Sequence, residues 1–152
     1  MAALVYPEWL PEALQEGYGF QPVSPVVRST FVSGRAMQRR AYTDTPTQVA
    51  VRWQLRDQVG ALFEKWFQED LHDGSAWFLC RLRTPLGMDY HKARFVDIYE
   101  GPTLVSGNFW LFTATLEVLR RPLLPDGSTA MPEVILNPDI FDQAMNREWP
   151  EA

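Results

Sequence analysis

Two stretches in the middle of the chain carry the clearest hydrophobic patterns. Residues 49–55 alternate between apolar and polar side chains, which predicts a strand with one buried face. Residues 57–71 instead place apolar side chains at spacings of three and four, which predicts a helix with one broad apolar stripe. The stripe consists of Val59, Leu62, Phe63, Trp66 and Phe67. Asp57 suits the start of this helix, and Asp73-Gly74 suits its end.

Four further segments have the β-branched and aromatic content of strands: 26–32, 76–82, 92–99 and 109–119. Turn chemistry separates them, at Ser33-Gly34-Arg35, at Thr84-Pro85-Leu86-Gly87 and at Ser106-Gly107-Asn108. Five short strands and one helix predict an α+β fold that is mostly β. We expect a small antiparallel split barrel or sandwich with one packed helix and extended N- and C-terminal arms.

Proline residues cluster towards the two ends of the chain. Residues 1–27 hold four prolines, three acidic residues and no Lys or Arg, and predict an extended arm with one helical turn near 12–15. Residues 122–152 hold five prolines and predict an acidic arm with one short helix over 139–147. The predicted body is therefore 28–121, with its helix at about 57–71.

The composition bounds the class of protein. With 152 residues the chain is long enough for one domain. A net charge of −5 argues against a polyphosphate backbone as the main partner, and we expect no sequence-specific nucleic acid. One cysteine excludes an intrachain disulfide framework and a zinc ribbon. The first residues lack the pattern of a signal peptide, and no apolar run approaches the length of a membrane span, so we expect a soluble protein without a membrane partner.

The residues that usually carry chemistry have structural explanations here. His72 precedes the helix stop, where a histidine interacts favourably with the helix dipole, and His91 lies in an expected polar loop with too few further ligands for a metal. Cys80 lies in mid-strand, which favours a small buried residue over a nucleophile. Glu64, Glu69 and Asp70 fall on the polar side of the helix. We expect no catalytic residues, no cofactor and no metal.

Charge is unevenly distributed along the chain. Six arginines and one acidic residue fall between Arg28 and Arg56, whereas six acidic residues and one arginine follow Pro122. Two solvated loops of opposite sign explain this, and so does docking of the acidic arm on the arginines, within one chain or on a neighbour. The docking hypothesis places Arg35, Arg39 and Arg40 on one side of an interface and Asp139, Asp142 and Trp149 on the other. Three aromatic residues lie in the arms outside the core pattern, and they either contact a partner or fold back on their own domain: Trp9, Phe141 and Trp149.

The order of these features resembles small tail proteins of tailed bacteriophages. The features are Ser33-Gly34-Arg35 with Gln38-Arg39-Arg40, the strand at 49–55, Phe63-Glu64-Lys65-Trp66-Phe67, Asp73-Gly74-Ser75-Ala76-Trp77-Phe78 and the closing strand at 110–119. The pattern covers roughly residues 28–120. It is most similar to the N-terminal domain of distal tail proteins and to the lambda-type minor tail protein M.

The resemblance implies a β-barrel-like domain with a helix packed across it and a threefold or sixfold ring at the end of the tail tube. It carries no catalytic residues. A virion structural protein of the tail tip or baseplate, made in the host bacterial cytoplasm and contacting the tail tube and tail hub proteins, is therefore our leading hypothesis.

Three other hypotheses stay open. One is a ring at the other end of the tail, as a head–tail joining or tail-terminator protein. Another is a small cytoplasmic enzyme or ligand-binding protein, which requires a pocket lined by Trp77, Trp110 or Tyr99. The last is an assembly chaperone that is absent from the finished particle.

Overall fold

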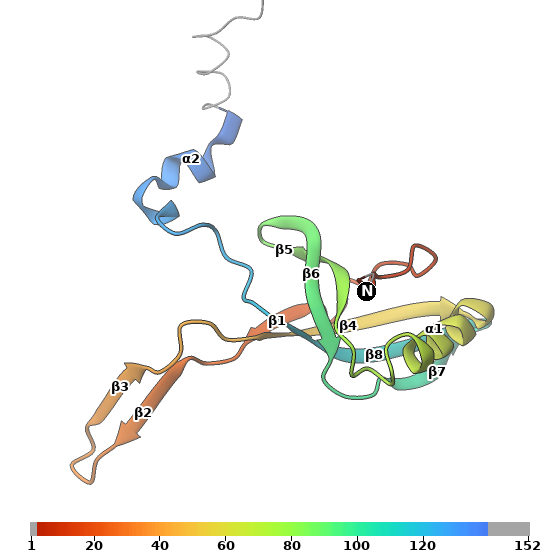
Figure 1. Ribbon diagram of the computed structural model, residues 1–152, viewed down its shortest axis with the longest axis horizontal. Coiled ribbons are helices and arrows are strands. Elements are labelled where there is room, and N and C mark those ends of the chain that lie inside the picture. The colour runs from red at the N-terminus through yellow and green to blue at the C-terminus, as the bar shows by residue number, and fades with distance from the viewer. Residues whose placement is uncertain (1–2, 140–152) are drawn as a thin grey trace, which may run out of the picture. The chain divides into compact units, whose positions relative to one another are not determined.

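A computed structural model describes residues 3–139 of the chain. It divides the chain into two compact units, 1–121 and 122–152, each of which is described by itself. The larger unit is mostly β and contains antiparallel sheets and one main helix, which confirms the predicted fold class (Figure 1). The strands are β1 (Gly19–Pro22), β2 (Val26–Thr30), β3 (Ala36–Arg40), β4 (Thr47–Arg56), β5 (Phe78–Thr84), β6 (Gly87–Phe95), β7 (Glu100–Ser106) and β8 (Phe109–Val118).

Strands β4 and β8 form the centre of a six-stranded antiparallel sheet. They pair along their whole length, from Thr47 opposite Val118 to Arg56 opposite Phe109. Strand β1 extends the sheet beyond β4, while β6 and β7 share the other side of β8 and β5 pairs with β6. The predicted alternation holds in β4, where every second residue from Thr47 to Leu55 is buried.

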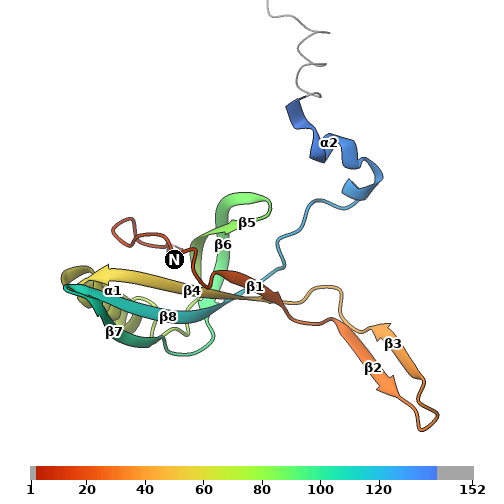
Figure 2. The ribbon, with the colours of Figure 1, turned by 180° about the vertical axis from the view of Figure 1, so that it is seen from behind.

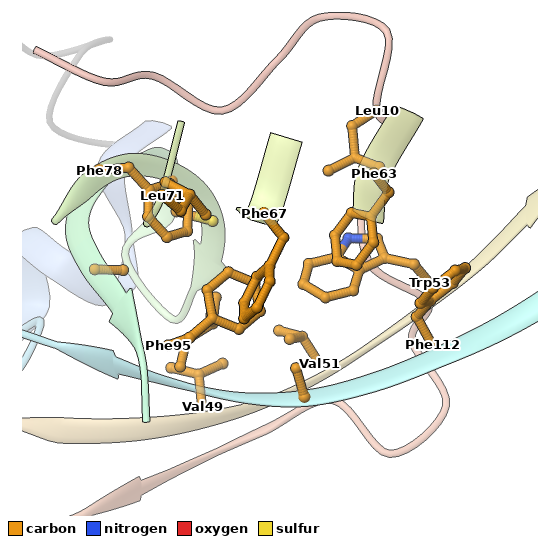
Figure 3. Close-up of a cluster of buried hydrophobic side chains, with 14 of the residues drawn as sticks. Leu10, Val49, Val51, Trp53, Phe63, Phe67, Leu71, Phe78, Phe95 and Phe112 are labelled. Atoms are coloured by element: carbon orange, nitrogen blue, oxygen red, sulfur yellow. The ribbon is translucent and has the colours of Figure 1, made fainter. Parts of the chain in front are cut away.

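Helix α1 (Asp57–Glu69) follows β4 directly and covers one face of the sheet. Figure 3 shows how its Phe63 and Phe67 meet aromatic residues of the strands. The ring of Phe63 lies 4.9 Å from that of Phe112 and 5.1 Å from that of Trp53, measured between centroids. Phe67 packs edge-on against Phe95 at 4.9 Å. Burying such side chains supplies most of the stability of a domain of this size.

The apolar stripe predicted for the helix is wider than the face it buries. Phe63, Trp66 and Phe67 are buried, but Leu62 is 53% exposed. The helix ends at Glu69, two residues earlier than predicted, and His72 and Asp73 adopt positive φ before Gly74 at φ 89° completes the turn. A side chain at Gly74 would meet the ring of Phe67 and the Cβ of Phe95, so the turn packs closely on the core.

The prediction of five strands was wrong, because residues 3–139 already form eight. All five residues of strand β3 are exposed, so its sequence lacks the apolar alternation from which a strand is predicted. Strand β7 contains Gly101 and Pro102, which indicated a turn; proline is tolerated here because β7 is an edge strand. Strand β6 begins at Gly87 and ends at Phe95, so the strand predicted at 92–99 was shifted, and His91 lies in a strand and not in a loop.

The proline-rich N-terminal segment contains no helical turn near 12–15, contrary to the prediction. It lies on the body: Val5 forms a parallel bridge with Leu79 of β5, and Leu10 is 3% exposed. The Tyr6 hydroxyl accepts a hydrogen bond of 2.8 Å from Trp53 Nε1 and donates one to the carbonyl of Pro11. The two alternatives for aromatic residues in the arms concern Trp9, Phe141 and Trp149; Trp9 is 41% exposed, and the other two lie outside the described residues.

The second unit is described only to residue 139. It contains a 3₁₀ turn (Ser128–Ala130) and the five-residue helix α2 (Pro132–Leu136), neither of which the sequence predicted. All residues of α2 are exposed, including Val134, Ile135 and Leu136. The helix predicted over 139–147 lies outside the described residues except for Asp139.

Candidate functional site

The β2–β3 hairpin packs little against the rest of the larger unit. All ten residues of its two strands are exposed, and the strands pair only with each other. Figures 1 and 2 show the hairpin standing clear of the six-stranded sheet. Val26, Val27 and Thr30 favour an extended backbone, and Gly34 at φ 83° closes the turn, so the sequence folds this way locally. An isolated two-stranded hairpin is only marginally stable in water, and a partner would stabilise it.

The pairing register assigns the residues of the hairpin to two faces. Val27 lies opposite Arg39 and Ser29 lies opposite Met37, so these four residues share one face. Phe31 N donates a backbone hydrogen bond to Arg35 O, which extends the same face to Phe31 and Arg35. On this face we group five side chains under the name Phe31 face: Val27, Phe31, Arg35, Met37 and Arg39. Three of these side chains are apolar: Val27 is 40% exposed, Phe31 50% and Met37 66%.

The opposite face of the hairpin is more polar. It carries Val26, Arg28, Thr30, Ala36, Gln38 and Arg40. Arg28 Nη1 donates a hydrogen bond of 3.2 Å to Gln38 Oε1 across the strands. The three arginines predicted at an interface therefore divide, with Arg35 and Arg39 on the Phe31 face and Arg40 on the other. Within residues 3–139, none of the three forms an ion pair.

The remaining arginines of the basic stretch do not belong to the hairpin. Arg52 and Arg56 lie on β4, where Arg52 pairs with Glu16 at 3.5 Å and Arg56 lies over the ring of Phe109. Arg81 of β5 pairs with Glu12 at 3.6 Å. Acidic residues of the N-terminal segment thus contact arginines of the sheet, a contact that the charge pattern alone did not reveal.

Two of the three residues that the sequence analysis places opposite the arginines of the hairpin lie outside the described residues. Asp139 is exposed at the end of the described part. Asp142 and Trp149 lie outside the described residues. Docking of the acidic arm therefore stays a prediction.

Cys80 is a core residue, as predicted. It is 1% exposed, and burial raises the pKa of its thiol to about 12. The thiol is therefore protonated at neutral pH and a poor nucleophile. His91, opposite Cys80 in the neighbouring strand, has a buried Nε2 without a hydrogen-bond partner among the described residues. No group of three or more His, Cys, Asp or Glu side chains within residues 3–139 is arranged to hold a metal ion.

The three aromatic residues suggested for a ligand pocket have separate environments. Trp77 lies under the guanidinium of Arg94 at 4.5 Å, and Trp110 donates a hydrogen bond to Asp57. Tyr99 packs on Phe63 and Phe67 and donates a hydrogen bond of 3.2 Å to Glu64 Oε1. Burial, together with the nearby Glu64 carboxylate, raises the pKa of Tyr99 to about 12.

A surface hollow of about 340 Å³ lies between the N-terminal segment and α1. Its apolar lining includes Val5, Trp9 and Leu62, which are 47%, 41% and 53% exposed. Glu69 and Asp70 at the end of α1 line it as well. We call this the Leu62 hollow. The hydrophobic pattern includes Leu62 in the apolar stripe of the helix, but in the structure Leu62 is exposed beside Trp9. The pattern did not predict this exposure.

Comparison with known proteins finds no family model and no curated protein sequence that matches this chain. Of the helices in the described part of the chain, none combines the length and the apolar character that crossing a membrane requires.

Proposed function

We propose that this chain is a structural subunit of a bacteriophage tail that assembles into a ring at the tail tip or baseplate and has no catalytic activity of its own. The β2–β3 hairpin carries the proposal, because its exposed arginines and apolar side chains need a partner surface. Interface cores are enriched in aromatic residues, Met and Arg, which is the composition of the Phe31 face. The resemblance of residues 28–120 to small phage tail proteins supplies the biological setting.

A structural role also fits the way the chain uses its aromatic residues. Trp53, Phe63, Phe67, Phe95 and Phe112 form one packed cluster, and their rings contact each other. A rigid body of this kind gives a subunit a fixed shape, which a ring requires.

The acidic C-terminal segment is the second element of the proposed assembly. Residues 122–152 contain six acidic residues and one arginine, and the chain up to residue 121 contains equal numbers of both charges. We propose that Asp139, with Asp142 and Trp149, adds to the contact with hairpin arginines of a neighbouring copy. Exposed ion pairs contribute little each, so this contact would be sensitive to salt.

The experiment is sedimentation velocity of the full chain across concentration and salt, beside a variant that lacks residues 122–152. We expect a discrete ring-sized species that high salt weakens and the deletion dissociates. A ring that persists unchanged in both conditions would remove the acidic segment from the interface. Gold-labelled antibody on assembled virions then distinguishes the tail tip from the head–tail junction, and labelling at the junction would contradict the tail-tip assignment.

Reproducible thermal stabilisation by a metabolite would instead favour the ligand-binding hypothesis, because a ligand that binds only the folded state raises its stability.

A further inference from the structure

The Phe31 face and the Leu62 hollow are complementary surfaces. The first presents three exposed apolar side chains next to two arginines, and the second presents three exposed apolar side chains next to two carboxylates. Each surface exposes apolar area to water, which docking would remove. Each arginine can also form a bidentate contact with a carboxylate.

The end of α1 is suited to a cationic partner. Its last turn contains Glu69 and no basic residue, and Asp70 is the C-cap. The carbonyl end of a helix carries partial negative charge, so carboxylates there repel the helix dipole and a guanidinium relieves the repulsion. Lys65 also lines the hollow, but it is paired with Glu69 at 3.0 Å. Asp70 forms no ion pair with a residue of the described part.

The distribution of charge agrees with this complementarity. Residues 26–40 carry four arginines and no acidic residue, and the rest of the chain up to residue 121 carries nine basic and thirteen acidic residues. The hairpin is thus +4 and the remainder of the same unit is −4. Opposite potentials of this kind accelerate and orient the encounter of two copies.

The positions of the two surfaces decide between contacts within and between copies. In both ribbon views the hairpin and α1 lie at opposite ends of the unit formed by residues 1–121 (Figures 1 and 2). A hairpin therefore reaches the hollow of another copy and not its own. Contacts between different surfaces of identical subunits are head-to-tail, and they close into a ring when the rotation between subunits permits it.

We propose that the Phe31 face of one copy docks into the Leu62 hollow of the next copy. Phe31 and Met37 cover Trp9 and Leu62, while Arg35 and Arg39 approach Glu69 and Asp70. This contact presupposes the self-assembly proposed above and assigns its two surfaces. It leaves Arg40, on the other face of the hairpin, to the acidic C-terminal segment.

Cysteine crosslinking between two single variants tests the contact directly. Phe31→Cys and Leu62→Cys are mixed in equal amounts under mild oxidation; the native Cys80 is 1% exposed and does not react. We expect a disulfide-linked dimer that contains one copy of each variant. Thr30→Cys, on the opposite face next to Phe31, is the matched control and should give little of this dimer with Leu62→Cys. Equal yields from Phe31→Cys and Thr30→Cys would overturn the assigned face.

A charge exchange tests the same contact without a crosslink. Arg39→Glu should raise the dissociation constant of self-association about 30-fold, as loss of a central contact does. Asp70→Arg in the same chain should restore most of the affinity, because the pair is reversed and not removed; such rescue also excludes misfolding as the cause. Arg83→Glu makes the same change in net charge on an exposed residue of β5, outside the hairpin and the Leu62 hollow, and should alter the constant by about threefold or less.

The outcomes separate this inference from the function on which it rests. If the wild-type chain associates and Arg39→Glu and Arg83→Glu weaken it equally, the head-to-tail docking is wrong while ring assembly stands. If the wild-type chain is monomeric at every concentration and no mixed dimer is trapped, both are wrong.

Discussion

Replacing Tyr6 with phenylalanine removes the hydroxyl that ties the N-terminal segment to the core. That hydroxyl accepts a hydrogen bond from Trp53 Nε1 at 2.8 Å, and Trp53 is 2% exposed. Without it, a buried indole N–H has no partner, which costs about 1–3 kcal/mol. The lost bond to the Pro11 carbonyl is exposed and adds little. We expect the free energy of unfolding to fall by about 2 kcal/mol, which corresponds to a decrease in Tm of roughly 6–10 °C for a unit of this size.

Urea unfolding followed by tryptophan fluorescence measures this change, and Tyr42→Phe is the control. Tyr42 is 63% exposed and makes no side-chain hydrogen bond to the described residues, so its variant should stay within about 0.5 kcal/mol of wild type. Hydrogen exchange should show faster exchange at the amide of Tyr6, which donates to Leu79 O at 2.8 Å. If Tyr6→Phe is as stable as Tyr42→Phe, the Trp53 N–H has another partner and the reasoning fails.

Three further predictions concern the core. Burial raises the pKa of Cys80 from its ordinary 9.0 to about 12, so the folded state binds this proton more tightly than the unfolded state. The free energy of unfolding should therefore decline from about pH 9 upward. Urea titrations at several pH values should show that Cys80→Ala flattens this decline. Gly74→Ala places a Cβ 3.0 Å from the ring of Phe67 and from the Cβ of Phe95 at φ 89°, and it should cost more than about 2 kcal/mol. Gly34→Ala, at φ 83° with nothing within 4 Å, should cost about 1 kcal/mol, and equal costs would show that the close packing is irrelevant. Phe63→Ala should cost about 3–5 kcal/mol and the neighbouring Leu62→Ala less than about 1 kcal/mol, because only Phe63 is buried; a large loss at Leu62 in thermal melts would contradict the exposed position.

The central elements were predictable because each buries a face at a regular period. Strand β4 has a residue period of two and α1 a period near 3.6, and both were found from that period alone. Strand β3 was missed because both of its faces are exposed and no apolar alternation remains. Strand β7 was missed because Pro102, which an edge strand accepts, indicates a turn in a sequence.

The candidate interface was predictable only in part. Counting charges identified Arg35, Arg39 and Arg40, but the faces on which they lie depend on the strand register, which sets Val27 opposite Arg39. The Leu62 hollow was not predictable, since it forms where the N-terminal segment packs beside α1, and such long-range packing leaves no local pattern. Leu62 itself fits a helical stripe equally well whether the stripe is covered or open.

Native mass spectrometry of the purified full-length chain tests the central claim most directly. Ring assembly through the hairpin predicts one discrete species at three or six times the 17.5 kDa of the chain, which a replacement of residues 26–40 by a short glycine-serine turn reduces to the monomer. A monomer at every concentration, or an oligomer that survives removal of the hairpin, would contradict the account.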